Sequence, residues 1–285
     1  MLLVEEMIKQ YNPETTEEVK AALKEILQSI VLVGLSRSGF FNKASFYGGT
    51  ALRIFYGLNR YSEDLYFTLN EKEENFNFEQ YFKTINEVAL SYGLELEISY
   101  KTKKIDTPIE SAFAKLNTYQ TLIKLKVNSN LTKYLHKDEL MKVKFEVDCY
   151  PSFGFNVESK WLDNPEYASV NVLDLPSLFA GKIHACLCRN WKTRVKGRDF
   201  YDYVFFLAMG AKVNLVNLKA KLVQSNYIPE DYNLTIENLR ALLTERFSNM
   251  DFTQAKEDVL PFVKDKTKLD IWGKEFFIEI TKQLQ

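Results

Sequence analysis

A glycine turn followed by an acidic strand is the feature of this sequence that most directly suggests chemistry. Residues 47–67 read YGGTALRIFYGLNRYSEDLYF, so Gly48, Gly49 and Thr50 precede a strand that carries Asp64. The two glycines let the backbone approach a ligand closely, and free N–H groups of the helix that begins at Thr50 can receive phosphate oxygens. The segment therefore indicates a phosphate-binding turn beside a carboxylate.

A second acidic strand follows at KFEVDCYP, where alternation places Glu146 and Asp148 on one face. Nucleotidyl transfer uses divalent cations that bridge the phosphates, and carboxylates from adjacent strands hold those ions. We therefore expect Mg²⁺ or Mn²⁺ to be held by Asp64, Glu146 and Asp148. The sequence does not tell which of the last two faces the metal. It also leaves open that both form the solvated face of an edge strand.

Residue 66 breaks the pattern that such a site requires. Alternation places it on the face of Asp64, where a catalyst with two metal ions needs a second carboxylate, but this chain has Tyr66. A phenol is neutral at pH 7 and is a poor ligand for Mg²⁺. Losing a bridging carboxylate is expected to slow the transfer by about 10³-fold or more.

The later part of the chain carries a second group of charged residues. Lys182 lies within an apolar helix, and Arg189 follows two turns later on the same face. Such a lysine either extends along the helix to the surface or enters a cleft to meet an anion. Asp199 and Asp202 share one side of the next helix. An alternative is that Asp199 only complements the helix dipole while Asp202 pairs with Arg198.

The basic stretch Arg189–Arg198, which includes Trp191, predicts a contact with RNA or a triphosphate unless it is merely solvated. The net charge is −1, so any polyanion must be held by such a local patch rather than by a global field. The sequence has no apolar run of membrane-spanning length, and its first residues are too acidic for a secretory signal. We expect a soluble, cytoplasmic protein without a membrane partner.

Hydrophobic periodicity predicts a mixed α/β front half and an all-helical back half that join near residue 160. The predicted strands are 44–47, 64–69, 94–100, 119–127 and 141–149. The predicted helices are 15–40, 76–92, 173–191, 199–209, 215–224, 252–262 and 269–284, with a short one after Thr50. No strand is predicted after residue 165.

These segments resemble the AbiEii/AbiGii nucleotidyltransferase toxins of the polymerase-β-like superfamily. The resembling segments cover most of the chain and are residues 46–67, 144–151, 175–207 and, more loosely, 258–262. The resemblance implies an α+β fold with a mixed sheet flanked by helices. Residues 1–160 would form the nucleotidyltransferase-like domain with its N-terminal helix. Residues 161–285 would form a helical domain that carries Lys182, Asp199 and Asp202.

The resemblance also assigns roles by position. The catalytic positions match Asp64, Lys182, Asp199 and Asp202, with one of the last two as general base. The nucleotide-binding positions match Gly48, Gly49, Thr50, Ser62, Lys182 and Arg198. The metal-binding positions match Asp64, Glu146 and Asp148, with Tyr66 at the expected second aspartate. We expect the folded chain to gather these groups around one cavity beside the glycine turn.

The activity that the family implies is transfer of a nucleoside monophosphate from an NTP to an acceptor. In some relatives that acceptor is the 3′ end of tRNA, and its modification halts translation. The family further implies a cognate antitoxin protein as partner and a role in abortive infection, which is a form of phage defence.

Tyr66 leaves three explanations open: a pseudoenzyme, a toxin disabled so that it can be produced, or an enzyme that recruits Glu63, Glu146 or Asp148. We expect impaired catalysis on a retained fold. The alternative functions are a catalytically inactive module that binds nucleotide or RNA and a module that docks an antitoxin. A P-loop kinase is disfavoured because GGT is not the GxxxxGK[ST] motif.

Overall fold

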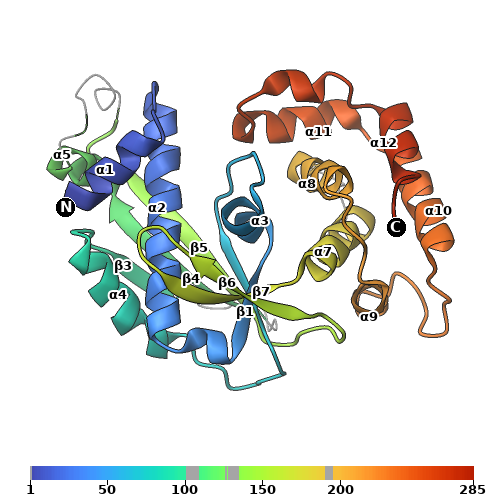
Figure 1. The fold of residues 1–285 in the computed structure, drawn as a ribbon, viewed down its shortest axis with the longest axis horizontal. Helices are drawn as coiled ribbons and strands as arrows, with labels where there is room; N and C mark the ends of the chain where they lie inside the picture. The colour runs from blue at the N-terminus through green and yellow to red at the C-terminus, as the bar shows by residue number, and fades with distance from the viewer. Residues whose placement is uncertain (1, 101–108, 126, 128–134, 190–194) are drawn as a thin grey trace. The chain divides into compact units, whose positions relative to one another are not determined.

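The computed structural model describes residues 2–100, 109–125, 127, 135–189 and 195–285, and its fold is α+β, as predicted. The chain divides into two compact units, which Figure 1 shows with their helices and strands labelled. Unit 1 comprises Met1–Phe55, Ser62–Pro151 and Ser159–Val172. Unit 2 comprises Tyr56–Tyr61, Ser152–Glu158 and Leu173–Gln285.

A seven-stranded mixed sheet, with the strand order β3-β4-β5-β2-β1-β7-β6, forms the body of unit 1. The strands are β1 Ala44–Tyr47, β2 Leu65–Leu69, β3 Glu97–Tyr100, β4 Ile109–Asn117, β5 Leu140–Asp148, β6 Val157–Leu162 and β7 Ala168–Leu173. Strand β2 runs parallel to β5 and antiparallel to β1, and β4 runs antiparallel to β3 and β5. The two predicted acidic segments are therefore neighbours in the middle of the sheet.

Strand β5 shows how the sequence gives this sheet one apolar and one polar face. Its buried residues are Met141, Val143, Phe145 and Val147, and the residues that alternate with them reach solvent at least in part. Because β4 and β2 flank β5 on both sides, the alternative that Glu146 and Asp148 lie on an edge strand is wrong.

The helices of unit 1 are α1 Leu2–Gln10, α2 Thr16–Arg37, α3 Gly49–Tyr56, α4 Phe82–Ser91 and α5 Thr118–Lys124, with 3-10 turns η1 Phe40–Asn42 and η2 Glu79–Tyr81. Helix α2 begins after the predicted capping chemistry, since Thr15 and Glu18 form a capping box. It packs against α4 and β5 and so covers the apolar face of the sheet (Figure 1). Phe40, Phe67 and Phe78 form an aromatic cluster in this core.

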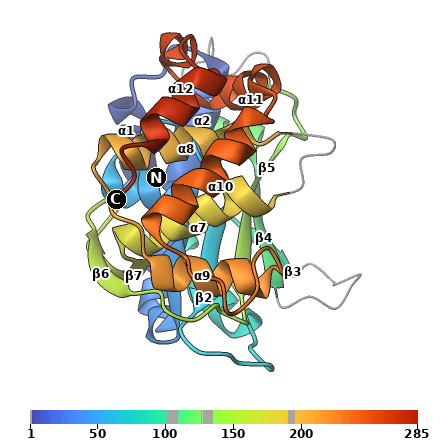
Figure 2. The same ribbon diagram turned by 90° about the vertical axis from the view of Figure 1, so that its right-hand side faces the viewer.

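Unit 2 is mainly helical and also includes the first residues of β6 and the last residue of β7. Its helices are α7 Leu175–Cys188, α8 Gly197–Ala208, α9 Leu215–Gln224, α10 Ile236–Ser248, α11 Phe252–Val259 and α12 Lys274–Thr281, with 3-10 turns η3 Leu260–Phe262 and η4 Lys266–Leu269. Helix α7 packs against α8, α9 and α10, while α8 packs against α11 and α10 against α12 (Figure 2). Phe200, Phe247, Phe252 and Phe277 fill the core between these helices.

Gly197 provides a test of this helix packing. A Cβ at this position would lie 1.8 Å from the carbonyl oxygen of Ala255 in α11. A backbone atom cannot rotate away, so Gly197→Ala must push α8 from α11. We expect it to lower the free energy of unfolding by about 1–3 kcal/mol, measured by urea denaturation. Gly181→Ala in α7 is the matched control, because a Cβ there meets no atom within 4 Å. Equal urea midpoints for the two variants would contradict the expectation.

The structure confirms most predicted elements in type and corrects others. Each predicted helix overlaps an observed helix, and the predicted strands 44–47, 64–69, 94–100 and 141–149 overlap β1, β2, β3 and β5. The predicted strand 119–127 is wrong, because Asn117 caps a helix there by accepting a hydrogen bond from the backbone N–H of Gln120. The predicted absence of strands after residue 165 is also wrong, since β7 pairs with β1.

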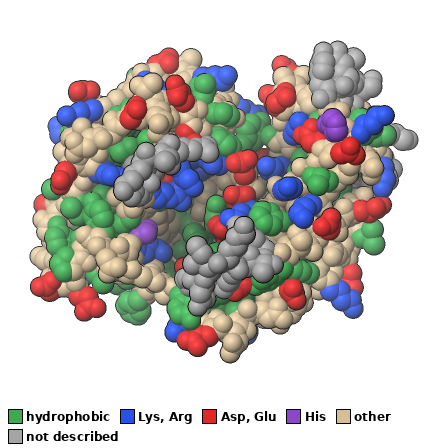
Figure 3. All heavy atoms as spheres, turned by 180° about the vertical axis from the view of Figure 1, so that it is seen from behind, with side chains coloured by type: hydrophobic (Ala, Val, Ile, Leu, Met, Phe, Trp, Pro, Cys, Tyr) green, Lys and Arg blue, Asp and Glu red, His purple; other side chains and the backbone are tan. Residues whose placement is uncertain are grey.

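The sequence analysis missed α1, α10, β4 and β6. The predicted domain boundary at residue 160 stays a prediction, and the compact units are each assembled from segments on both sides of that position. Among the described residues, every helix is too short or too polar to cross a membrane. Figure 3 shows Lys and Arg side chains interspersed with Asp and Glu side chains on the face it presents, in line with the net charge of −1.

Candidate active site

The diglycine turn joins β1 to α3. Gly48 has a φ of +87°, which an L side chain rarely adopts, and a Cβ there would lie 3.1 Å from Cδ2 of the Tyr66 ring. A glycine is therefore required for both the turn and the close approach to the ring. Helix α3 begins at Gly49, so its first N–H groups lack intrahelical partners and can receive an anion.

The hydroxyls of Thr50 and Ser62 are used inside the protein. Both residues are buried, and the Thr50 hydroxyl donates to the backbone carbonyl of Asp64 at 2.6 Å and lies 2.8 Å from the Ser62 hydroxyl. The Gln28 amide donates to the carbonyl of Ser62 at 3.1 Å. These bonds hold the segment that leads to Asp64, while the nucleotide-binding roles of Thr50 and Ser62 stay predictions.

Asp64, Tyr66 and Glu146 come together on the polar face of the sheet. The Tyr66 hydroxyl donates to Asp64 Oδ2 at 3.3 Å, and Tyr66 is the direct partner of Glu146 in the parallel β2–β5 pair. Asp148 is level with Thr68, and its carboxylate accepts a bond from a backbone N–H two residues later at 3.0 Å. Glu146 rather than Asp148 therefore lies beside the Asp64–Tyr66 pair.

The surroundings of Asp64 disfavour its charged form. Burial raises the pKa of the Asp64 carboxyl above its ordinary value, and the charges of Glu63 and Glu146 raise it further. The hydrogen bond from Tyr66 and the charge of Lys144 lower this pKa without restoring it to the ordinary value. The folded chain therefore holds a carboxylate here at a cost in stability.

That cost can be measured with Asp64→Asn. Because the folded pKa is raised, ionised Asp64 destabilises the folded state, and this penalty grows as the pH rises through the unfolded pKa of about 4 and the folded pKa above it. We expect Asp64→Asn to have a higher urea midpoint than the wild type at pH 7, and this difference to shrink toward pH 4. A lower midpoint for the variant at pH 7 would show that Asp64 stabilises the fold.

Lys144 also lies on this face, two residues before Glu146 on β5. Its ammonium forms an ion pair with the Glu146 carboxylate, and both side chains are mostly buried. Strand alternation, the rule that placed Glu146, assigns Lys144 to the same face, so the sequence contained the signal that could have found it.

The residues present do not fit a site for two metal ions. Throughout the described ranges, no group of three or more His, Cys, Asp or Glu side chains could hold a metal ion. Tyr66 supplies a phenol where the pattern needs a carboxylate, and the Lys144 ammonium occupies the Glu146 carboxylate in an ion pair. The predicted binding of Mg²⁺ or Mn²⁺ by Asp64, Glu146 and Asp148 stays a prediction.

Unit 2 buries a network of charged side chains. Arg60 donates two hydrogen bonds to the Asp202 carboxylate, at 2.6 and 2.7 Å. The Lys182 ammonium lies 2.9 Å from Asp199 and 2.7 Å from Asp202, and Arg189 completes the network through an ion pair with Asp199. Asp202 is fully buried, and the Arg60 side chain is only 3% exposed.

The network favours the charged forms of Lys182 and Asp199. Burial would lower the pKa of the Lys182 ammonium, but Asp199 and Asp202 outweigh it and raise that pKa above its ordinary value. Burial would likewise raise the pKa of Asp199, yet Lys182 and Arg189 outweigh it and hold that pKa low. Lys182 therefore meets two anions of its own chain, and the alternative that it extends along the helix to the surface is wrong.

Arg60 and Lys182 both bind the Asp202 carboxylate, and the predicted pairing of Asp202 with Arg198 stays an alternative. The Arg198 guanidinium lies 4.2 Å from the ring centroid of Phe262, which belongs to the resembling segment 258–262. The backbone N–H of Tyr61 donates to the carbonyl of Phe262 at 2.8 Å. The predicted nucleotide-binding role of Arg198 stays a prediction.

Two further predictions remain untested. Trp191 and its neighbours at 190–194 lie outside the described residues, so the predicted contact of this stretch with RNA or a triphosphate stays a prediction. The acidic group of unit 1 and the lysine–aspartate network of unit 2 are each described within their own unit. Whether they gather around one cavity therefore stays a prediction as well.

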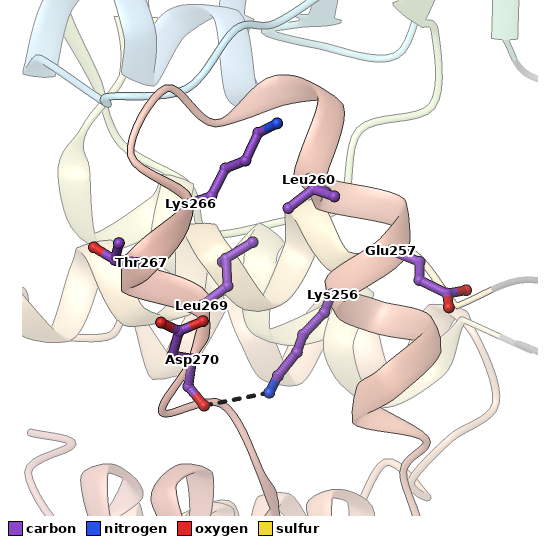
Figure 4. Close-up of a pocket in the computed structure, with 7 residues that line it drawn as sticks. All are labelled: Lys256, Glu257, Leu260, Lys266, Thr267, Leu269 and Asp270. Carbon is purple, nitrogen blue, oxygen red and sulfur yellow. Dashed lines mark hydrogen bonds between the residues drawn. The ribbon is translucent and has the colours of Figure 1, made fainter.

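A pocket of about 280 Å³ lies elsewhere in unit 2 (Figure 4). It is lined by Lys256, Glu257, Leu260, Lys266, Thr267, Leu269 and Asp270. The Lys256 ammonium donates to the backbone carbonyl of Asp270 at 3.3 Å, as the dashed line in Figure 4 shows. None of the predicted site residues lines this pocket.

Comparisons with known proteins agree with the resemblance. A family model described as nucleotidyl transferase AbiEii toxin, Type IV TA system, matches residues 30–277. MenT4, a nucleotidyltransferase toxin from Mycobacterium tuberculosis, has a similar structure with a TM-score of 0.58 and 14% identity, over 99% of this chain and 90% of that one. A candidate nucleotidyltransferase from H. pylori has a TM-score of 0.51 and 20% identity, over 92% of each chain. No curated protein matches the sequence.

Proposed function

The chain belongs to the AbiEii family of nucleotidyltransferase toxins, and from this membership we propose that it transfers a nucleoside monophosphate from an NTP to an RNA hydroxyl. In this reaction the acceptor oxygen bonds to the α-phosphorus and the bond from that phosphorus to the β-phosphate oxygen breaks. Pyrophosphate leaves, and the proton of the hydroxyl passes to a base. We propose tRNA as the acceptor class.

The observation that carries this proposal is the arrangement in unit 1. The diglycine turn offers backbone N–H groups to phosphate oxygens. Asp64 immediately precedes β2, Glu146 lies on the parallel neighbour β5, and the Tyr66 ring beside them lies against Gly48. A phosphate-binding turn adjacent to paired carboxylates is the arrangement that transfer from a triphosphate needs.

In unit 2 we propose that Lys182 contacts the nucleotide, as its family position implies. Asp199 and Asp202 then hold the ammonium in place, because both carboxylates bind it within 3 Å. The low pKa of Asp199 makes it a weak proton acceptor, so positioning suits it better than the predicted role of general base.

The test is an assay of the purified chain with NTPs labelled at the α-phosphate and total tRNA, run in parallel with Tyr66→Asp. Label on tRNA from either protein supports the proposal. Absence of transfer by both proteins, with all four NTPs and with Mg²⁺ or Mn²⁺ present, contradicts it.

Tyr66 favours a second candidate function, a module that binds the nucleotide without turning it over. Calorimetry distinguishes the two: NTP binding by the wild type without label transfer supports the second function, and lack of any NTP binding removes it. A cognate antitoxin, a cytoplasmic location and phage defence belong to the main proposal. Growth arrest upon expression, relieved by co-expression of a neighbouring gene, supports that part of it.

A further inference from the structure

Four residues of different charge lie together on the polar face of the sheet, namely Asp64, Tyr66, Lys144 and Glu146. The register pairs Leu65 with Phe145 and Tyr66 with Glu146. Asp64 and Lys144 each precede these pairs by one residue, and the charge of Lys144 acts on the Asp64 carboxyl. The phenol of Tyr66 is therefore level with the Glu146 carboxylate, and the Lys144 ammonium acts on both carboxylates.

Lys144 acts on both carboxylates. It forms an ion pair with Glu146, in which the two side chains are 26% and 20% exposed, and its charge favours the ionised form of Asp64. Water screens this partly buried ammonium less than it screens a surface lysine. The lysine thus supplies positive charge where a divalent cation would otherwise be held.

We propose that Lys144 takes the place of a protein-bound divalent cation at Asp64 and Glu146, so that the chain without nucleotide does not bind Mg²⁺ or Mn²⁺. A divalent ion entering this site would meet the like charge of Lys144 and the neutral phenol of Tyr66 beside the carboxylates of Asp64 and Glu146. Any effect of Lys144 on catalysis depends on the proposed function. Under that function, a divalent cation reaches Asp64 only with the triphosphate.

The test is a Mn²⁺ titration of the full chain without nucleotide, followed by the electron paramagnetic resonance signal of free Mn²⁺. We expect the wild type to bind no Mn²⁺ up to about 1 mM, the weak end of carboxylate sites. Lys144→Met is expected to gain one Mn²⁺ site that binds at least about tenfold more tightly than this wild-type limit, because the substitution removes a like charge at contact distance. Combining Lys144→Met with Asp64→Asn is expected to remove that site again.

Lys142→Met is the matched control, since Lys142 lies on the same face of β5 but is exposed and two residues farther from Glu146. Equal Mn²⁺ binding by the Lys142 and Lys144 variants, or tight binding by the wild type, overturns the proposal. Circular dichroism checks that each variant folds, and Lys144→Gln replaces Lys144→Met should the latter unfold. This titration contains no nucleotide, so its result does not depend on whether the chain transfers nucleotide to tRNA. Failure of the labelling assay and failure of this proposal can therefore be told apart.

Discussion

Tyr66→Asp is expected to raise the rate of nucleotide transfer by about 10³-fold, the loss expected when a bridging carboxylate is missing. The reason is geometric as well as chemical. Position 66 is level with Glu146 and shares its face with Asp64, so a carboxylate there completes three acidic ligands on two adjacent strands. The measurement is single-turnover transfer from an NTP labelled at the α-phosphate.

The matched control is Tyr66→Asn, which also removes the ring beneath Gly48 but adds no charge. It is expected to stay at the wild-type rate, so that the gain can be attributed to the carboxylate rather than to the space that the ring leaves. A wild-type rate equal to that of Tyr66→Asp would show that catalysis here does not need a second carboxylate at position 66.

Asp202→Ala is expected to lower the free energy of unfolding by about 3–5 kcal/mol, the usual result when one partner of a buried ion pair is removed. Asp202 is fully buried and accepts two hydrogen bonds from Arg60 while it binds Lys182. Without it, a guanidinium that is 3% exposed loses its carboxylate partner. Urea denaturation measures the change.

Glu279→Ala is the control for this experiment, because it also removes a carboxylate from an ion pair in unit 2. Its pair with Lys282 is 68% exposed on both sides, so its loss is expected to change stability by at most about 1 kcal/mol. Similar losses for the two variants would mean that water reaches the Asp202 network when the aspartate is removed.

The elements that the sequence predicted well are those whose signals are local. Helix α2 has a capping box at Thr15, and α9 begins and ends where its periodicity does. Strand β7 was missed because its place depends on pairing with β1, and the two lie more than a hundred residues apart in the chain. The segment that begins at Tyr119 has strand-like residues, but the cap at Asn117 and its position after β4 make it helical.

The residues of the candidate site divide in the same way, into those with a local sequence signal and those that depend on the tertiary structure. Spacing in the sequence singled out Asp64, Lys182 and Asp202 as candidates, and their functional roles stay predictions. Spacing did not identify Arg60 as the partner of Asp202, since 142 residues separate them and no periodicity links a loop arginine to a distant helix. Strand alternation could have found Lys144, whereas the partners of Lys182 required the tertiary structure.

The segment Tyr56–Tyr61 belongs to unit 2 although residues on both sides of it belong to unit 1. Dissecting this protein into two fragments by a single cut is therefore not feasible. A C-terminal fragment starting near residue 161 would lack Arg60 and leave Asp202 with Lys182 alone. During synthesis, Arg60 leaves the ribosome long before its aspartate does, so the last tertiary contacts of the early segment must wait for the late helices.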